Sequence, residues 1–203
     1  FSWASGIQAL PNGHDQQSSS EAVHGYYALY AYGSMVDGAS FAGQLQDFGR
    51  LLAAMEAHGA DTYWHVRSSS DIYGEGFGHP LVGILWEHTA SYRTWFGGSG
   101  CMVSSVQMLP FTPASENLLQ ADWVGEHLPA YRADCSGDPS CAAQGWSWAL
   151  CLEEGILDTE AARRCLRSLP KNAFSTDVAA ASGNSLTNSW HWIATRPQAA
   201  HAV

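Results

Sequence analysis

The sequence predicts a mainly α-helical protein with long loops and a few short strands. One indication is a capping box: Ser18 precedes Glu21 by three positions, so the hydroxyl and the carboxylate can satisfy free amides of a first helical turn. A second indication is an apolar stripe at steps of three or four positions, which is the helical period. It consists of Phe41, Leu45, Phe48, Leu52 and Met55.

The expected elements follow from local signals along the chain. Gly59 suits the position just after a helix, and Asp158 suits the cap before one. Ser-, Gly- and Asp-rich stretches indicate loops. Helices are expected over residues 18–32, 40–58, 115–131, 139–152 and 159–169, with a further helical turn over 61–66. Strands or turns are expected over 81–98, 103–111 and 190–195, and loops over 1–17, 67–80 and 170–188.

Charge and hydropathy exclude two classes of partner. The formal net charge is −10 and the pI is near 5.2, so the chain repels phosphate backbones and anionic lipid surfaces. No apolar run reaches the roughly 18 residues that a membrane span requires. We therefore expect neither a nucleic-acid partner nor a membrane span. Phe1 in place of Met suggests a processed or truncated product.

Five cysteines indicate disulfides, although buried free thiols would give the same count. Cys135 and Cys141 flank a turn-rich loop and are expected to pair. Cys151 and Cys165 lie in consecutive expected helices and are a second expected pair. Cys101 is then left over, for a partner outside this segment. The spacings do not match a zinc site, so no metal and no cofactor are expected. Disulfides favour an extracellular or cell-surface location.

Aromatic residues are abundant, with nine Trp and eight Tyr. Such rings can stack on the apolar faces of sugars, but they can equally fill a protein core. Composition alone favours the core.

Seven ordered stretches resemble glycoside hydrolase family 81, the endo-β-1,3-glucanases. Together they span nearly the whole chain. They are Ser2–Gly6, Ser18–Tyr27, Thr62–Val66, Val82–Trp86, Thr94–Gly97, Gln107–Pro113 and Gly183–Pro197. The resemblance implies part of an (α/α)6 toroid, or barrel. Residues 1–203 would form its carboxy-terminal portion, with the amino-terminal β-sandwich and the first barrel helices absent.

The resemblance also assigns catalytic positions. An inverting glycosidase uses one carboxyl group as acid and another as base. The family's base is the first Glu of an E-S-S-S-E motif, and Gln17 occupies that position here. The second Glu of the motif is retained as Glu21, which also has the capping role. Asp15 is a weaker candidate for a substitute carboxylate. The family's general acid lies in a His-rich motif before the stretch that contains Trp3, and no such motif occurs in this chain.

Substrate contacts are expected in the matched stretches. Ser104 replaces a His that usually precedes the family's Gln, which is retained as Gln107. Glu116 follows the same stretch and either faces the cleft or favours a helix N-terminus. The candidate stacking rings, each of which could instead be core, are Trp3, Tyr26, Trp64, Trp86 and Trp95.

Three functions remain open at this point. The first is a catalytically impaired relative that binds β-1,3-glucan or serves as a structural part of an extracellular assembly. The second is a piece of an active endo-β-1,3-glucanase whose remainder lies on another segment or chain. The third is a helical domain that shares only the fold. The first two require β-1,3-glucan or a related polysaccharide as partner, and another chain or segment that completes the barrel.

Overall fold

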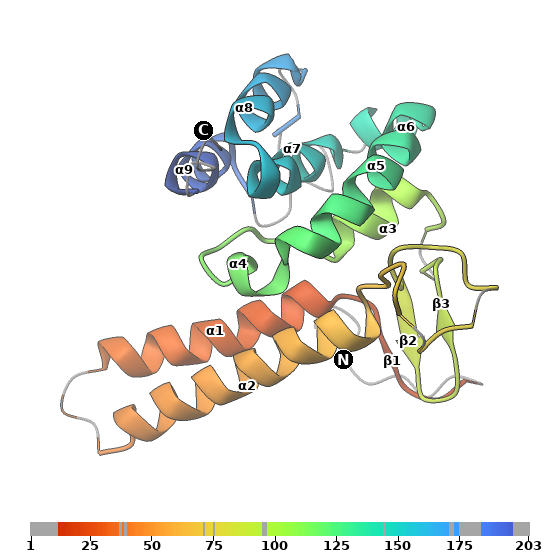
Figure 1. Cartoon of the computed structure of the whole chain (residues 1–203). Helices are drawn as coiled ribbons and strands as arrows, with labels where there is room; N and C mark the ends of the chain where they lie inside the picture. The colour runs from red at the N-terminus through yellow and green to blue at the C-terminus, as the bar shows by residue number, and fades with distance from the viewer. Residues whose placement is uncertain are drawn as a thin grey trace, which may run out of the picture.

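The computed structural model describes residues 12–36, 38, 40–70, 72–74, 76–94, 97–143, 145–170, 173–174 and 184–196. Helices dominate this part of the chain, so the expected mainly α class is confirmed (Figure 1). The helices are α1 (Ser19–Met35), α2 (Ala42–Tyr63), α3 (Gly100–Val106), α4 (Ser115–Leu118), α5 (Ala121–Gly137), α6 (Pro139–Ala143), α7 (Ser147–Leu157), α8 (Thr159–Ser168) and α9 (Leu186–Thr195). None of these described helices is long and apolar enough to cross a membrane.

A small antiparallel sheet leads into the first helix. Its strands β1 (Asp15–Gln16), β2 (Ile84–Trp86) and β3 (Ala90–Ser91) lie in that order, with Asp15 opposite Trp86. The sheet lies at one end of the α1–α2 pair (Figure 1). Because β1 runs directly into α1, the sheet fixes where that helix begins.

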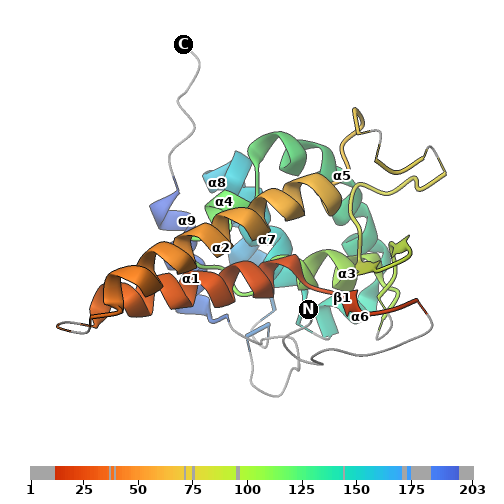
Figure 2. The same ribbon diagram turned by 90° about the horizontal axis from the view of Figure 1, so that it is seen from below.

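Helices α1 and α2 form a long antiparallel hairpin that extends away from the rest of the molecule (Figures 1 and 2). Two glycines allow the backbones to approach closely. A Cβ atom at Gly49 would lie 2.4 Å from the Tyr30 backbone nitrogen, and one at Gly33 would lie 2.6 Å from that of Gln46. Only glycine fits both contacts without separating the helices.

The main core lies among α3, α5, α7 and the helices beside them. Trp123, Tyr131 and Trp148 are buried there, and Phe111 packs edge-on against Trp148 and Trp192. The Trp192 indole also donates to the Leu152 carbonyl at 3.0 Å, which links α9 to α7. These large rings are therefore part of the core.

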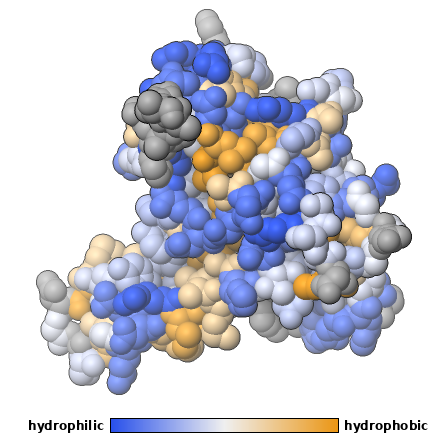
Figure 3. Space-filling model, viewed as in Figure 1, coloured by the Kyte–Doolittle hydropathy of each residue, from blue (hydrophilic) through white to orange (hydrophobic). Residues whose placement is uncertain are grey.

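The apolar stripe of the second helix does not face this core. Helix α2 contains the stripe from Leu45 to Met55, but Phe48 and Met55 are 53% and 61% exposed. Leu51, which lies beside the stripe, is 56% exposed. Figure 3 shows apolar residues along this hairpin at the surface. Tyr32 and Met35 of α1 are exposed as well. A substantial apolar face of the hairpin is therefore left uncovered by the described residues.

Several predicted elements are correct and others are wrong. The start of α1 at the Ser18 cap and the span of α8 are confirmed. Helix α2 continues past His58, so Gly59 lies inside it. The predicted strand over 103–111 begins in helix α3, and the strand-like 190–195 lies in helix α9. The helices expected over 115–131 and 139–152 are each two: α4 and α5, and α6 and α7.

The cysteines also differ from prediction in one respect. Cys151 and Cys165 form the expected disulfide between α7 and α8. The predicted Cys135–Cys141 pair is wrong, because each of these residues is instead placed to bond with Cys101. Cys101 therefore needs no partner outside the segment. The spacing argument missed this because α3 approaches the other two cysteines only in space.

Candidate functional site

The position expected for the base lies between β1 and α1. Gln17 is 3% exposed, and its Nε2 donates a hydrogen bond to Asp15 Oδ2. Asp15 is also buried, and its other carboxylate oxygen has no hydrogen-bond partner in the described part of the chain. A carboxamide cannot accept a proton from water at neutral pH, so Gln17 itself supplies no base.

Gln107 fixes this junction through four hydrogen bonds. Its Nε2 donates to the carbonyls of Gln17 at 2.6 Å and Gly83 at 3.2 Å. Its Oε1 accepts from the backbone nitrogen of Ser19 at 3.0 Å and from the Ser19 hydroxyl at 3.2 Å. Because all four bonds are to protein groups and the residue is 1% exposed, Gln107 positions the Gln17 backbone.

The three serines after Gln17 attach the start of α1 to the end of α3. Ser18 caps α1 by accepting from the Glu21 amide at 3.2 Å, and its hydroxyl donates to the Val106 carbonyl at 2.9 Å. The Ser20 hydroxyl donates to the Leu109 carbonyl at 2.6 Å. The Ser18 half of the expected capping box is thus present. Glu21 is half-buried in the first turn of α1, four residues after Gln17.

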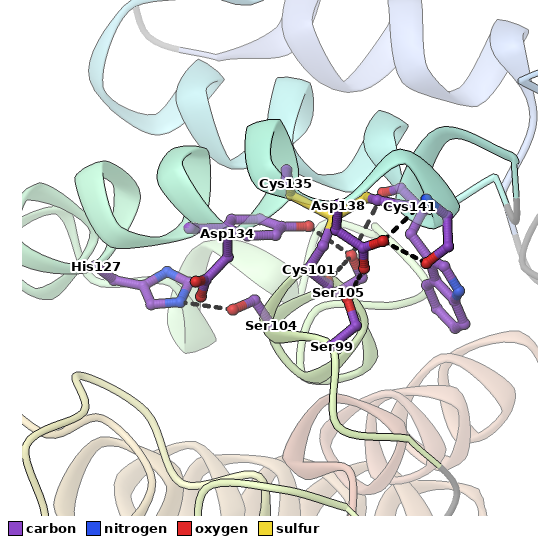
Figure 4. The surroundings of a disulfide bond; sticks show 12 residues. Ser99, Cys101, Ser104, Ser105, His127, Asp134, Cys135, Asp138 and Cys141 are labelled. Carbon is purple, nitrogen blue, oxygen red and sulfur yellow. Dashed lines mark hydrogen bonds between the residues drawn. A yellow bond between two sulfur atoms is a disulfide. The ribbon is translucent and has the colours of Figure 1, made fainter.

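Ser104 belongs to a buried hydrogen-bond chain. Its Oγ lies 3.1 Å from His127 Nε2, and His127 Nδ1 lies 2.7 Å from Glu153 Oε1 (Figure 4 shows the Ser104–His127 contact). A Ser–His–carboxylate order is also that of hydrolase triads, but here all three residues are at most 1% exposed. These three side chains link α3, α5 and α7.

The candidate stacking rings lie in different environments. Tyr26 on α1 and Trp86 on β2 are half-buried, whereas Trp64 is 2% exposed and belongs to the core. Trp3 and Trp95 lie outside the described residues. The role of these rings, and of Ser104 and Gln107, in sugar binding stays a prediction. Glu116 lies at the start of α4 and forms an ion pair with Arg196.

Histidines are the residues that sequence reasoning passed over. His24 contacts the hydroxyls of Thr112 and Ser115, at 2.9 and 3.4 Å. Burial lowers the pKa of His24 to about 4, so the ring is neutral near pH 7. His65 is buried too and stacks on Trp123, with ring centroids 3.7 Å apart.

Two sizeable cavities are lined by described residues, and neither includes Gln17 or Glu21. One, of about 550 Å³, lies between α1, α2 and α4 beside Tyr27, Tyr30 and Arg50. The other, of about 650 Å³, lies beside Tyr73 and Phe77. The base position is therefore not at either of these hollows.

Comparison with known protein families agrees with the resemblance carried by the seven ordered stretches. Residues 1–193 match the glycosyl hydrolase family 81 C-terminal domain. The chain belongs to this family. A glucan endo-1,3-β-D-glucosidase of Glycine max is 30% identical over 201 residues, covering 96% of this chain and 28% of that protein. A glucan endo-1,3-β-D-glucosidase of Acetivibrio thermocellus is 23% identical to this chain, and the match covers 23% of the length of that protein.

A solved structure shares the fold. It is a family 81 glycoside hydrolase of Clostridium thermocellum, studied as a mutant, with a TM-score of 0.73 and 22% identity. The match covers 91% of this chain and 24% of that one. The family 81 chain thus spans about a quarter of the length of these relatives.

Proposed function

We propose that this family 81 chain recognises β-1,3-glucan but is catalytically impaired, as a glucan-binding or structural component of an extracellular assembly. The observation that carries the proposal is the group at the base position. Gln17 places an amide there, and that amide is bound to Asp15. Loss of a general base typically lowers the rate about 10²- to 10⁴-fold.

Glucan recognition is supported separately from catalysis. The matched relatives are named for endo-1,3-β-glucosidase activity, and the family match extends over residues 1–193. Sugar affinity depends on exposed rings and polar groups, which do not require the base. Among the candidate rings, Tyr26 and Trp86 retain exposed surface and are the best placed to contact a polysaccharide.

Two assays on the purified chain test this proposal. Release of reducing ends from laminarin should be undetectable, while the Glycine max glucosidase run in parallel should be active. Affinity electrophoresis in gels that contain laminarin should retard the chain, and Trp86→Ala should reduce the retardation. Hydrolysis of laminarin by the chain would overturn the proposal that it is catalytically impaired. Equal mobility with and without laminarin would overturn glucan recognition by this chain.

A second candidate function is a piece of an active endo-β-1,3-glucanase. Two observations favour it: the chain spans about a quarter of its relatives, and Phe48, Leu51 and Met55 of α2 are uncovered. Such a face suits contact with another segment of the same barrel, or with another chain. In a longer protein that carries the rest of the barrel, α2 should then be protected from hydrogen exchange. Turnover in that longer protein would favour the second candidate.

An extracellular or cell-surface location is part of the proposal. It is supported by the disulfide between Cys151 and Cys165, since such bonds persist in oxidising compartments. Detection of the chain in culture medium with this disulfide intact would agree. A reduced chain confined to the cytosol would contradict it.

A further inference from the structure

Three cysteines meet where α3, α5 and α6 approach one another (Figure 4). Cys101 lies in α3, Cys135 in the last turn of α5 and Cys141 in α6. Cys101 is within bonding reach of both others, with Cα–Cα separations of 4.7 Å to Cys135 and 6.0 Å to Cys141. Both separations fall in the ordinary range for disulfides, about 4.4–6.8 Å.

One sulfur atom forms one disulfide at a time, so these two pairings exclude each other. The chain has five cysteines, and Cys151 is already joined to Cys165. Either pairing of Cys101 therefore leaves one thiol over. That thiol is Cys141 in one form and Cys135 in the other.

The two possible free thiols differ in exposure. Cys141 is 2% exposed and Cys101 is fully buried, whereas Cys135 retains exposed surface. Only the form with a Cys101–Cys141 bond presents a free thiol to solvent. The loops closed by the two bonds span 34 and 40 residues, so chain entropy hardly distinguishes them.

Asp138 connects the segments that carry the three cysteines, and its own backbone amide donates to the Cys135 carbonyl at 3.4 Å. Its carboxylate accepts from the Ser140 amide at 2.9 Å and from the Ser99 hydroxyl. Its carbonyl accepts from the Cys141 amide at 3.0 Å. Ser99 is the N-cap residue of the helix that carries Cys101, and its hydroxyl bonds Asp138 rather than the helix, so Asp138 holds the turn before Cys141 against the start of α3.

A metal site explains the cluster less well. Structural zinc takes four ligands. Among the described residues, no fourth His, Cys or carboxylate joins the three cysteine sulfurs. A trio with two allowed pairings is the arrangement needed for thiol–disulfide exchange.

We propose that Cys135 is a modification site: a thiol set free by the Cys101–Cys141 bond, which forms mixed disulfides with external disulfides. The Cys135 thiolate attacks one sulfur of the external disulfide. A bond from Cys135 to that sulfur forms, the external S–S bond breaks, and the leaving thiolate takes up the proton that Cys135 lost. Within the chain, the same thiolate can attack Cys101 and release Cys141. This assignment does not depend on glucan recognition.

Peptide mapping of the unreduced 203-residue chain tests the proposal. The native protein is treated with N-ethylmaleimide and cleaved before aspartates, which isolates Cys135 between Asp134 and Asp138. We expect alkylation at Cys135 and an assembly of three peptides, in which residues 138–157 are joined to 71–121 through Cys141 and Cys101 and to 158–176 through Cys151 and Cys165. Oxidised glutathione should add one glutathionyl group, at Cys135. Alkylation only at Cys141 or Cys101, or no native alkylation at all, would overturn the proposal.

Cys141→Ser is the matched control. It leaves Cys101 with Cys135 as its only nearby partner, so reaction with glutathione should slow by at least about tenfold. Cys135→Ser should abolish the reaction and keep the Cys101–Cys141 bond. If Cys141→Ser leaves Cys135 fully reactive, Cys135 is an independent surface thiol and the proposed sharing of Cys101 is refuted. The wild-type peptide map decides the pairing even if a variant fails to fold.

Discussion

The Gln17 carboxamide donates a hydrogen bond to the Asp15 carboxylate, and both side chains are buried. At the junction between β1 and α1 the carboxylate therefore belongs to Asp15, which lies two residues before the position of the family's base. This pair gives Gln17 a definite partner, and it predicts how the reverse substitution would behave.

Gln17→Glu should destabilise the chain at neutral pH. The introduced carboxyl would meet Asp15 in a buried site, so it should hold its proton to a higher pH than a free glutamic acid. We expect a loss of about 1–3 kcal/mol at pH 7. Because the folded form binds the extra proton, this penalty should disappear as the pH falls below about 4. Thermal unfolding at pH 7 and pH 4 measures it.

Asp15→Asn combined with Gln17→Glu is the control for that substitution. It exchanges acid and amide, and most of the stability at pH 7 should return. Neither variant should hydrolyse laminarin as the isolated chain, because one carboxylate is half of an inverting pair. Equal stability of wild type and Gln17→Glu at pH 7 would show that the two side chains do not interact in solution.

Gly49→Ala should weaken the α1–α2 hairpin. The added methyl group would lie 2.4 Å from the Tyr30 backbone nitrogen, so the helices must separate, at a cost of about 1–3 kcal/mol. Gly59→Ala on the same helix is the control, because nothing lies within 4 Å of its added Cβ. That change should stabilise the helix by about 0.5–1 kcal/mol. Urea unfolding of both variants tests whether close packing or helix propensity dominates.

The starts of helices were predictable where a cap was visible. Ser18 and Asp158 were recognised as caps, and both accept from backbone amides as expected. Helix α3 was missed because Val103 and Val106 favour strands. Most of its residues are buried, so no amphipathic pattern marked it. Helix α9 had a cap at Ser185, which accepts from Asn188, but its aromatic residues suggested a strand.

The sequence identified residues of the candidate site but did not predict which residues they contact. The sequence resemblance identified Gln17 as the altered base position. The contact with Asp15 depends on the turn between β1 and α1, and the fixing of Gln17 by Gln107 spans 90 positions along the chain. Such contacts between distant positions arise from packing, which local patterns do not report. The same limit hid the approach of Cys101 to Cys135 and Cys141.

His127→Ala should be among the most destabilising single changes. It removes the partner of Glu153, whose other carboxylate oxygen already lacks a hydrogen bond in the described part of the chain. Leaving a buried hydrogen-bonding group without its partner typically costs about 1–3 kcal/mol, and more where the group is charged. Glu153→Gln is the milder counterpart, since its amide oxygen can still accept from His127. Denaturant unfolding should rank the two variants clearly, and similar losses would argue that the hydrogen bond from His127 does not dominate the stability of this cluster.

Stability should fall with acid through His24. Burial lowers the pKa of this histidine to about 4, against an ordinary value of 6.5. The unfolded chain therefore binds the proton first, and stability contributed by the neutral ring is present above pH 6.5 and lost between pH 6.5 and 4. The loss should reach about 2–3 kcal/mol near pH 4.5. His24→Asn keeps a polar group near Thr112 without a titrating ring, so its unfolding free energy should vary less over this range. If the variant and the wild type lose stability in parallel, His24 is not the group that senses acid.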